Sequence, residues 1–402
     1  MRQLLLRGVT VAVVLGLALT GSQVFAQKAV LAGDTRPYFA STPHPYPVGN
    51  ESRPVVWSDT IKSDGATFLR IHFVNFDLAP GDFVTIHGPK GEIHRYEAKG
   101  PRGTGEFWSF STDGDTATVK LHGGKAMGSG YTIDRIGHGT LPSEGAGPTE
   151  GPTPEVICGT DGRKHVACYT TPPKSTWNPI ARLLFVNDVD GFQYVCTGSL
   201  VTAPNANTLM TNNHCIDTQS ETNSLQARFN YQKKNCNGNQ FETVSNYNGG
   251  TFLITSPIVG GLDYTLLTLL GSPEATWGEM TPTTLKPAPG SLMHFPQHPG
   301  GFEKKLGRFE DKPQTTRCTV YSIDQTFCTS SPTCNPTQAN TQFNYGCDSQ
   351  GGSSGSPILT DAANRVWGLH HLGGITSCSN AATHMNLICN HAGAGNLTCA
   401  SN

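Results

Sequence analysis

The sequence predicts an all-β protein, on three observations. Short apolar segments of strand length recur along the chain and are separated by Gly, Pro and Asp. Glycine (46 residues) and proline (27) are plentiful, while charged residues make up only 14% of the 402. Apolar spacing typical of amphipathic helices is scarce. This profile indicates a turn-rich globular protein, long enough for two domains, and not a coiled coil or a disordered tail.

Residues 1–26 have the features of a secretory signal peptide. Arg2 and Arg7 supply positive charge, and the apolar run from Val9 to Leu19 is too short to span a bilayer. Small residues in the triplet that ends at Ala26 predict cleavage after that residue. A retained membrane anchor is the alternative, but no later segment is apolar enough to span a membrane. We therefore expect a secreted, extracellular protein with no membrane partner after cleavage.

Residues 27–136 are predicted to form a small β-sandwich. Leu69, Ile71 and Phe73 alternate with Arg70 and His72, which is the two-residue period of a strand. Strand-like segments continue at 83–86, 107–110, 116–121 and 131–136. A ligand-binding role is the alternative to a prosegment role here, although no aromatic strip or metal cluster demands it.

Residues 137–157 are predicted to be an exposed linker. They are rich in Gly, Pro, Thr and Glu and have almost nothing to bury. Such segments are natural sites of proteolytic cutting. The linker separates the sandwich from residues 158–402, where strand-like segments resume and the length suits two packed β-barrels.

All 12 cysteines lie between Cys158 and Cys399. An even number in an exported chain predicts disulfides, up to six, each stabilising the fold by about 2–4 kcal/mol. Zinc binding is the competing interpretation, but no two cysteines form a CxxC pair. The formal net charge is −2 and becomes −4 without the two signal arginines, with no Lys/Arg cluster. This argues against a nucleic-acid partner.

The segment Gly351-Gly352-Ser353-Ser354-Gly355-Ser356-Pro357 predicts a nucleophilic serine. A nucleophile needs a tight turn that exposes its oxygen, together with backbone N–H groups that hold an oxyanion, and glycine permits such a turn. The alternative is an ordinary Gly/Ser loop.

Two other segments offer partners for Ser354. His214 follows the apolar segment 208–210 and precedes Cys215, which we expect to bridge to Cys196, and this position favours a general base. Asp263 opens the apolar run 264–267, where its carboxylate could accept the ring N–H of His214. A turn-capping aspartate is the alternative, and Asp217 is too close in sequence to His214 to be preferred.

The chain order His, Asp, Ser is that of chymotrypsin-type proteases. The segments CTGSLV, TNNHC, LDYTLL and GGSSGSPIL resemble the bacterial lysyl and glutamyl endopeptidase branch of the trypsin-like superfamily. The resemblance covers roughly 177–388, and the strands of 57–136 are similar to the prosegment of lysyl-type enzymes. It implies a double β-barrel of the chymotrypsin type after the sandwich.

The resemblance implies a role for each candidate residue. His214 would be the general base, Asp263 its orienting partner and Ser354 the nucleophile that forms an acyl-enzyme, with the N–H groups of Gly352 and Ser354 as the oxyanion hole. Protein or peptide substrates are the expected partners, and no metal or organic cofactor is required. A non-catalytic trypsin-like binding protein or adhesin is the alternative, although such proteins usually lose a triad member.

Substrate preference rests on conflicting residues. Asp348 stands six residues before Ser354, where trypsin keeps the aspartate that selects Lys and Arg, but it also follows Cys347 and would suit a structural role. His370 lies where glutamyl enzymes place a carboxylate-binding histidine, while His371 is expected to be a pocket-wall or solvated residue. We favour a basic P1 residue. Ser353 replaces the aspartate that pairs with the new N-terminus of trypsin, so that ion pair is not expected.

Overall fold

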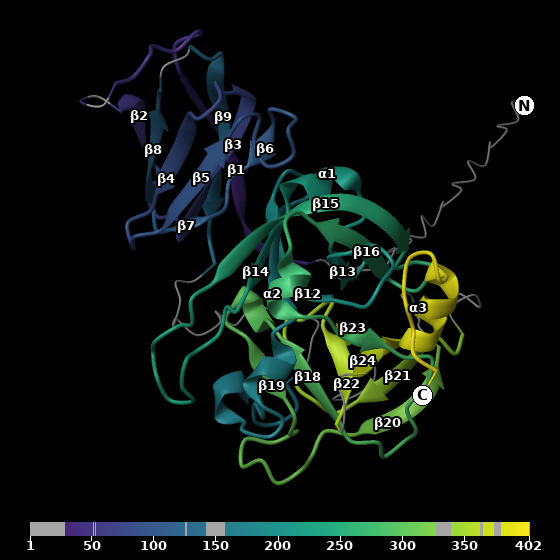
Figure 1. Ribbon diagram of the computed structural model, residues 1–402. Coiled ribbons are helices and arrows are strands. Elements are labelled where there is room, and N and C mark those ends of the chain that lie inside the picture. The colour runs from purple at the N-terminus through teal and green to yellow at the C-terminus, as the bar shows by residue number, and fades with distance from the viewer. Residues whose placement is uncertain are drawn as a thin grey trace, which may run out of the picture.

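The computed structural model describes residues 29–50, 52, 54–124, 127–141, 157–326, 339–361, 365–373 and 379–401. The predicted signal peptide and most of the predicted linker lie outside these ranges. The described chain is 46% strand and 9% helix, which confirms the all-β prediction. An N-terminal β domain lies beside a larger body built from two barrel-like sheets (Figure 1).

The N-terminal β domain contains two antiparallel sheets. One has the order β2-β8-β4-β5, and the other contains β1, β9 and β3 with the short β6 and β7 on its edge. Their strands are β1 (Val30–Ser41), β2 (Val55–Lys62), β3 (Phe68–Asp77), β4 (Phe83–His87), β5 (Ile93–Glu97), β6 (Phe107–Trp108), β7 (Thr112–Asp113), β8 (Thr116–His122) and β9 (Gly130–Gly139). Phe73 stacks on Phe107 in the core between them, at 5.1 Å between ring centroids. β9 ends at Gly139, so it includes the first three residues of the expected linker, 137–139.

Strand β3 differs from a half-exposed strand because both of its faces are covered. Leu69, Ile71 and Phe73 face the core of the N-terminal domain, as the alternation predicts. Arg70 and His72 on the opposite face are also buried, at 0% and 3% exposed. Arg70 donates from Nη2 to the carbonyl of Ser224 at 2.6 Å, so its face is covered by the larger body.

The first barrel closes on itself through six strands. The order is β11-β14-β15-β16-β13-β12, and β12 returns to pair with β11. These strands are β11 (Ile180–Val186), β12 (Gln193–Leu200), β13 (Thr208–Thr211), β14 (Gln226–Phe229), β15 (Ser245–Ser256) and β16 (Tyr264–Leu269). Its core contains Leu183, Leu209 and Leu267.

The second sheet curls into a half-barrel. Its order is β10-β19-β18-β22-β23-β24-β21-β20, with β17 paired to β23. The strands are β10 (Lys164–His165), β17 (Thr281–Pro282), β18 (Met293–Gln297), β19 (Lys305–Gly307), β20 (Val320–Gln325), β21 (Gln342–Tyr345), β22 (Pro357–Thr360), β23 (Arg365–Gly373) and β24 (Asn380–His384). The helices of the described chain are α1 (Gln219–Ser224), α2 (Pro273–Trp277) and α3 (Met385–Ala392), with short 3₁₀ turns at Val166–Cys168, Lys174–Trp177 and Pro299–Gly301.

A shared apolar cluster packs the two sheets of the larger body together. Met210 and Tyr264 from the first barrel meet Leu359 and Leu369 from the second, all completely buried. β13 ends and β16 begins at this contact. The loop that follows β13 and the loop that precedes β16 therefore meet the second barrel there. The arrangement is the double barrel expected from the resemblance.

The N-terminal β domain is joined to the first barrel by hydrogen-bonded strands. β1 pairs antiparallel with β12 at one end and with β9 along the rest of its length, so a single sheet runs through both parts. In Figure 1, the purple β1 runs from the N-terminal domain down to the teal β12. The sequence did not predict this continuity.

Four disulfides tie the described part of the larger body. They are Cys168–Cys236, Cys196–Cys215, Cys318–Cys347 and Cys389–Cys399. The expected Cys196–Cys215 bridge is among them. Within the described ranges, the helices are all too short or too polar to cross a membrane.

Candidate active site

His214 stands in the short loop that follows β13 and is held in place from two sides. The Cys196–Cys215 disulfide fixes the residue after it to β12. The side-chain amide of Asn212 donates to the carbonyl of Asp263 at 2.7 Å, which ties the same loop to the start of β16. The side chain of His214 is only 3% exposed, so contacts within the protein, and not with solvent, fix its orientation.

Asp263 receives two hydrogen bonds from His214. Its Oδ2 lies 2.8 Å from His214 Nδ1, and its Oδ1 accepts the backbone N–H of His214 at 3.0 Å. Burial alone raises the pKa of Asp263, but the facing rings of His214 and His371 lower it by a larger amount, so the pKa lies well below its usual value. The carboxylate therefore stays ionised and orients the imidazole with Nε2 away from it.

The backbone of Asp263 adopts a left-handed conformation, with φ of +51°. Aspartate tolerates this region better than most residues, because its short polar side chain bonds locally. Such conformations cost of order 1–3 kcal/mol and persist where the surroundings over-determine them. Here the two bonds to His214 and the bond from Asn212 provide that constraint.

Ser354 lies in a tight turn that only glycine allows on its C-terminal side. Gly355 has φ of +86°, and a Cβ placed on it would lie 2.1 Å from the carbonyl oxygen of Thr197. Gly352 likewise has φ of +93°. The predicted role of the glycines as turn formers agrees with these conformations. Ser354 itself is 2% exposed.

Strand β12 connects the serine turn to the histidine loop. The N–H of Thr197 donates to the carbonyl of Ser354 at 2.9 Å, and its hydroxyl donates to the carbonyl of Gly352 at 2.8 Å. Thr211, three residues before His214, donates from its hydroxyl to the carbonyl of Thr197 at 2.9 Å. The turn that carries Ser354 and the loop that carries His214 are thus bonded to the same residue.

The Nε2 atom of His214 is buried and has no hydrogen-bond partner within the described part of the chain. This is the nitrogen that a general base would use to take a proton from a serine hydroxyl. Because Asp263 occupies Nδ1, the ring is prepared for that role at Nε2.

His371 contacts the same carboxylate and was not predicted to do so. From β23, its Nδ1 lies 3.3 Å from Asp263 Oδ2, and its Nε2 lies 2.9 Å from Gln342 Oε1. Burial lowers the pKa of His371, and the facing Asp263 opposes that shift. Successive residues of a strand point to opposite faces. Two adjacent histidines on one strand therefore point to opposite faces. This alternation could have predicted that one of His370 and His371 faces the first barrel.

His370 points to the interior of the second barrel. Its Nδ1 lies 2.6 Å from the hydroxyl of Tyr345, and its ring lies 4.7 Å from that of Phe295. Its backbone is bonded to the serine turn, because its carbonyl accepts the N–H of Gly355 at 3.0 Å and its N–H donates to Ser356. The residue is completely buried. Together with these backbone bonds, its burial places it beneath the turn that carries Ser354.

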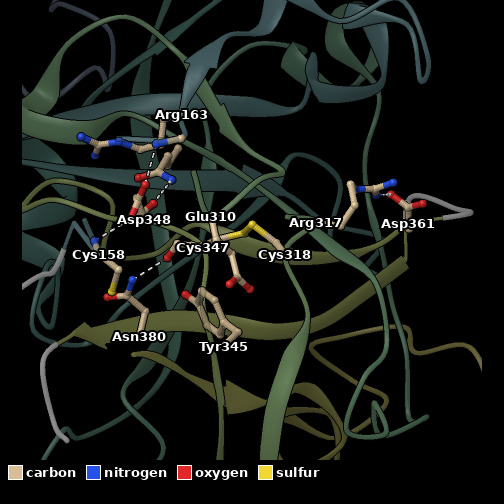
Figure 2. Close-up of a disulfide and its surroundings, with 12 residues drawn as sticks. Cys158, Arg163, Glu310, Arg317, Cys318, Tyr345, Cys347, Asp348, Asp361 and Asn380 are labelled. Carbon is tan, nitrogen blue, oxygen red and sulfur yellow. Dashed lines mark hydrogen bonds and ion pairs between the residues drawn. A yellow bond between two sulfur atoms is a disulfide. The ribbon is translucent and has the colours of Figure 1, made fainter. Parts of the chain in front are cut away.

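Asp348 is buried, and its carboxylate binds the chain's own backbone. Oδ1 accepts the N–H of Cys158 at 2.8 Å and Oδ2 accepts the N–H of Gly162 at 2.7 Å, as Figure 2 shows for Cys158. Burial raises the pKa of Asp348, and the two backbone bonds oppose that shift. Both oxygens are therefore used to hold the segment 158–162 against the second barrel, close to the Cys318–Cys347 disulfide (Figure 2).

Ser353 is also occupied by its neighbours. Its hydroxyl donates to Oε1 of Gln297, at 2.6 Å between the two oxygens, and it is completely buried. The residue next to Ser354 thus makes a polar contact that carries no charge.

Cys196 and Cys215 lie close to the ring of His214, but they are bonded to each other and offer no thiolate to a metal.

Three comparisons with known proteins bear on this site. A family model described as "Lysyl endopeptidase, C-terminal domain" matches residues 160–387, more than half of the chain. The chain is 28% identical over 337 residues to "Secreted RxLR effector protein 73" of Plasmopara viticola, which covers 79% of this chain and 77% of that protein. It is 25% identical over 261 residues to a lysyl endopeptidase of Pseudomonas aeruginosa, covering 62% of this chain and 56% of the relative.

Two of the solved structures that match the chain are named as an endopeptidase and a protease. A Glu endopeptidase in complex with MPD is 21% identical, covers 57% of this chain and 94% of that structure, and gives a TM-score of 0.39. The active form of the protease Rv3671c from M. tuberculosis is 14% identical, covers 63% and 96%, and gives a TM-score of 0.40.

The family match contains both barrels of the larger body. It also includes the loops that carry His214, Asp263 and Ser354. The chain therefore belongs to the lysyl endopeptidase C-terminal domain family of trypsin-like serine proteases.

Proposed function

We propose that the chain is a secreted serine endopeptidase whose catalytic triad is His214, Asp263 and Ser354. The observation that carries the proposal is the pair of hydrogen bonds from His214 to the buried carboxylate of Asp263. It fixes the imidazole in the orientation that a general base requires. The disulfides of the described chain and the name of the Plasmopara viticola relative, a secreted effector protein, support export.

The proposed reaction is peptide hydrolysis in two steps. The hydroxyl of Ser354 attacks the peptide carbonyl while His214 takes its proton, and backbone N–H groups of Gly352 and Ser354 stabilise the oxyanion. His214 then protonates the leaving amine. Water hydrolyses the acyl-enzyme with His214 again acting as base. Asp263 stabilises the charged imidazolium throughout.

A direct experiment tests this proposal. The exported protein would be incubated with a mixed peptide library, alongside a Ser354→Ala variant, and the products read by mass spectrometry. Cleavage by the parent protein and none by the variant would support the proposal. Equal cleavage by both would contradict it. No cleavage by either, with intact folding, would favour the alternative of a non-catalytic trypsin-like binding protein.

We propose a basic P1 residue as the finer preference. The name of the Pseudomonas relative, a lysyl endopeptidase, supports it. Asp348 is a weak source of this preference, because backbone amides already occupy both of its oxygens. We assign it instead to anchoring the start of the larger body, and the same peptide library would report which residue precedes each cut.

A further inference from the structure

We propose that the second barrel holds a binding site for a small oxyanion, such as sulfate or a phosphate group, beside Arg308 and Arg317. The site lies outside the candidate active site and does not depend on the proposed endopeptidase activity. His294, Trp177 and Asp361 complete it. Three observations carry the proposal: a surplus of positive charge, buried donors without acceptors, and partial access of both guanidinium groups to solvent.

A loop that folds back on itself brings the two arginines together. Arg308 follows β19, and the N–H of Cys318, next to Arg317, donates to the carbonyl of Arg308 at 3.0 Å. Both guanidinium groups reach Oδ1 of Asp361, with Nη2 of Arg308 at 3.4 Å and Nη2 of Arg317 in a shorter contact that Figure 2 shows. Two cations therefore share one carboxylate, which leaves these three side chains with a surplus of positive charge.

Several buried donors of the cluster lack acceptors. Within the described ranges, Nε of Arg308, Nε of Arg317 and the indole nitrogen of Trp177 are buried and have no hydrogen-bond partner. Both ring nitrogens of His294 are in the same state, and the residue is only 1% exposed. Its ring lies 5.8 Å from that of Trp177. Buried polar groups are normally satisfied, so these donors indicate an acceptor that the protein itself does not supply.

Both guanidinium groups are partly open to solvent and suit an oxyanion. The side chain of Arg308 is 15% exposed and that of Arg317 is 28% exposed, so an anion can reach them in the folded protein. Nη1 of Arg308 donates to the carbonyl of Thr171, which fixes its orientation. Guanidinium groups bind phosphate and similar anions through paired N–H donors. A tetrahedral oxyanion can accept from donors that converge from several directions.

His294 couples the proposed site to pH. Burial lowers the pKa of His294, Asp361 opposes that shift, and the two arginines add to it. Tyr169 faces Arg308 and Arg317 as well, and burial raises its pKa, so this phenol stays neutral. An anion beside the arginines would offset their charge and favour the protonated imidazole. Anion binding should therefore be accompanied by proton uptake and should strengthen as pH falls.

Calorimetric titration of the exported protein with sodium sulfate, at constant ionic strength, tests the site. Arg317→Gln should weaken sulfate binding by roughly tenfold, because it removes charge-assisted donors. Asp361→Asn should strengthen binding by roughly threefold, because it removes the carboxylate that competes for both arginines. A gain in affinity cannot result from a damaged fold. Lys312→Gln is the matched control, since it removes a positive charge from an exposed residue of the same loop and should leave sulfate affinity unchanged.

The pH dependence tests the role of His294 separately. Sulfate keeps its charge between pH 7 and pH 5, so a change in its affinity over this range reports on the protein. Affinity should rise in the parent protein as pH falls, by at most about tenfold per pH unit for one coupled proton, and should rise less in His294→Phe. Inorganic phosphate and O-phosphoserine, compared at pH 7, distinguish a site for the free ion from a site that also accepts a phosphate monoester.

Three results would overturn the proposal. Absence of sulfate binding to the parent protein would mean that ordered water satisfies the buried donors. Equal weakening by Lys312→Gln and Arg317→Gln would mean that sulfate is attracted only by overall charge. Weaker binding in a folded Asp361→Asn variant would mean that the carboxylate does not compete with the anion. Because the readout is binding, none of these results bears on the role of Ser354.

Discussion

At the residue scale, the proposed chemistry depends on the ionised carboxylate of Asp263. Removing its charge should leave the loop geometry largely in place, because an amide oxygen can still accept one bond. It should also favour the wrong tautomer of His214. The consequence would appear in the chemical step and not in the fold.

We therefore predict that Asp263→Asn lowers kcat by about 10⁴, the scale seen when a triad aspartate is neutralised. Asp217→Asn is the matched control, because Asp217 lines the cavity beside His214 without bonding to its ring. Peptide hydrolysis and thermal unfolding would be measured for both. A loss of activity in the control as large as that in Asp263→Asn would refute the assignment.

The turn at Gly355 gives a second prediction at this scale. Gly355→Ala adds a Cβ that would lie 2.1 Å from the carbonyl of Thr197, at a φ that strains any L residue. We expect activity to fall by at least about tenfold, together with a loss of about 1–3 kcal/mol in unfolding free energy. Gly395→Ala is the control, since its Cβ would meet no atom. Equal behaviour of the two variants would contradict a specific role for this turn.

The sequence predicted one contact between candidate residues and missed the contacts around it. His214 and Asp263 were predicted to bond, and the structure brings them together. The contact of His371 with Asp263 was missed, because a single sequence does not say which face of β23 meets the first barrel. Asp348 could not be assigned either, since its partners are backbone N–H groups 190 and 186 residues away in the sequence.

At the scale of elements, Asp348 anchors the segment that opens the larger body. Its two oxygens bind the N–H groups of Cys158 and Gly162, and the side chain of Asp348 itself is buried. Neutralising the side chain removes at least one charge-assisted bond and leaves a buried donor without a partner.

We predict that Asp348→Asn lowers the free energy of unfolding by about 1–3 kcal/mol while P1 preference stays the same. Denaturant unfolding and the peptide library would check the two halves of this statement. Asp161→Asn, which affects the ion pair with Arg163 on the same segment, is the comparison. A shift of P1 preference away from Lys and Arg, with stability unchanged, would return Asp348 to a substrate-binding role.

The elements themselves show where local patterns suffice. The alternation at 69–73 predicted β3, because an apolar face needs a core on one side. The same pattern gave no sign that Arg70 and His72 would also be buried. That burial comes from docking against the first barrel, a long-range contact that the two-residue period does not encode.

At the scale of the whole molecule, buried histidines should make the fold sensitive to acid. Burial lowers the pKa of His294 to about 3 and that of His384 to about 4. Above the usual value near 6.5 both folded and unfolded chains hold these rings neutral. As pH falls below 6.5 the unfolded chain takes up protons that the folded chain does not, so stability is lost progressively towards pH 3–4.

We predict that His294→Phe weakens the dependence of the unfolding free energy on pH below 6.5. His294 has no hydrogen-bond partner for either ring nitrogen in the described ranges and lies 5.8 Å from the ring of Trp177, so an aromatic replacement suits the site. Each such group contributes up to about 1.4 kcal/mol per pH unit. Unfolding free energies would be measured from pH 7 to 4. An unchanged slope in the variant would show that another group dominates.

The overall architecture was predictable to the level of two β-rich parts, because strand length, turn residues and cysteine placement are local features. The joining of the parts through β1 and β12 was not. Pairing between strands more than 150 residues apart depends on register and docking, as Gln193 with Gly33 illustrates.

The most direct test of the central claim is chemical labelling of the nucleophile. The exported protein would be treated with a fluorophosphonate and digested, and the modified residue located by mass spectrometry, alongside a His214→Ala variant. We predict an adduct on Ser354 in the parent protein and a rate of labelling reduced by orders of magnitude in the variant. An adduct on a different serine, or equally fast labelling without His214, would contradict the proposed triad.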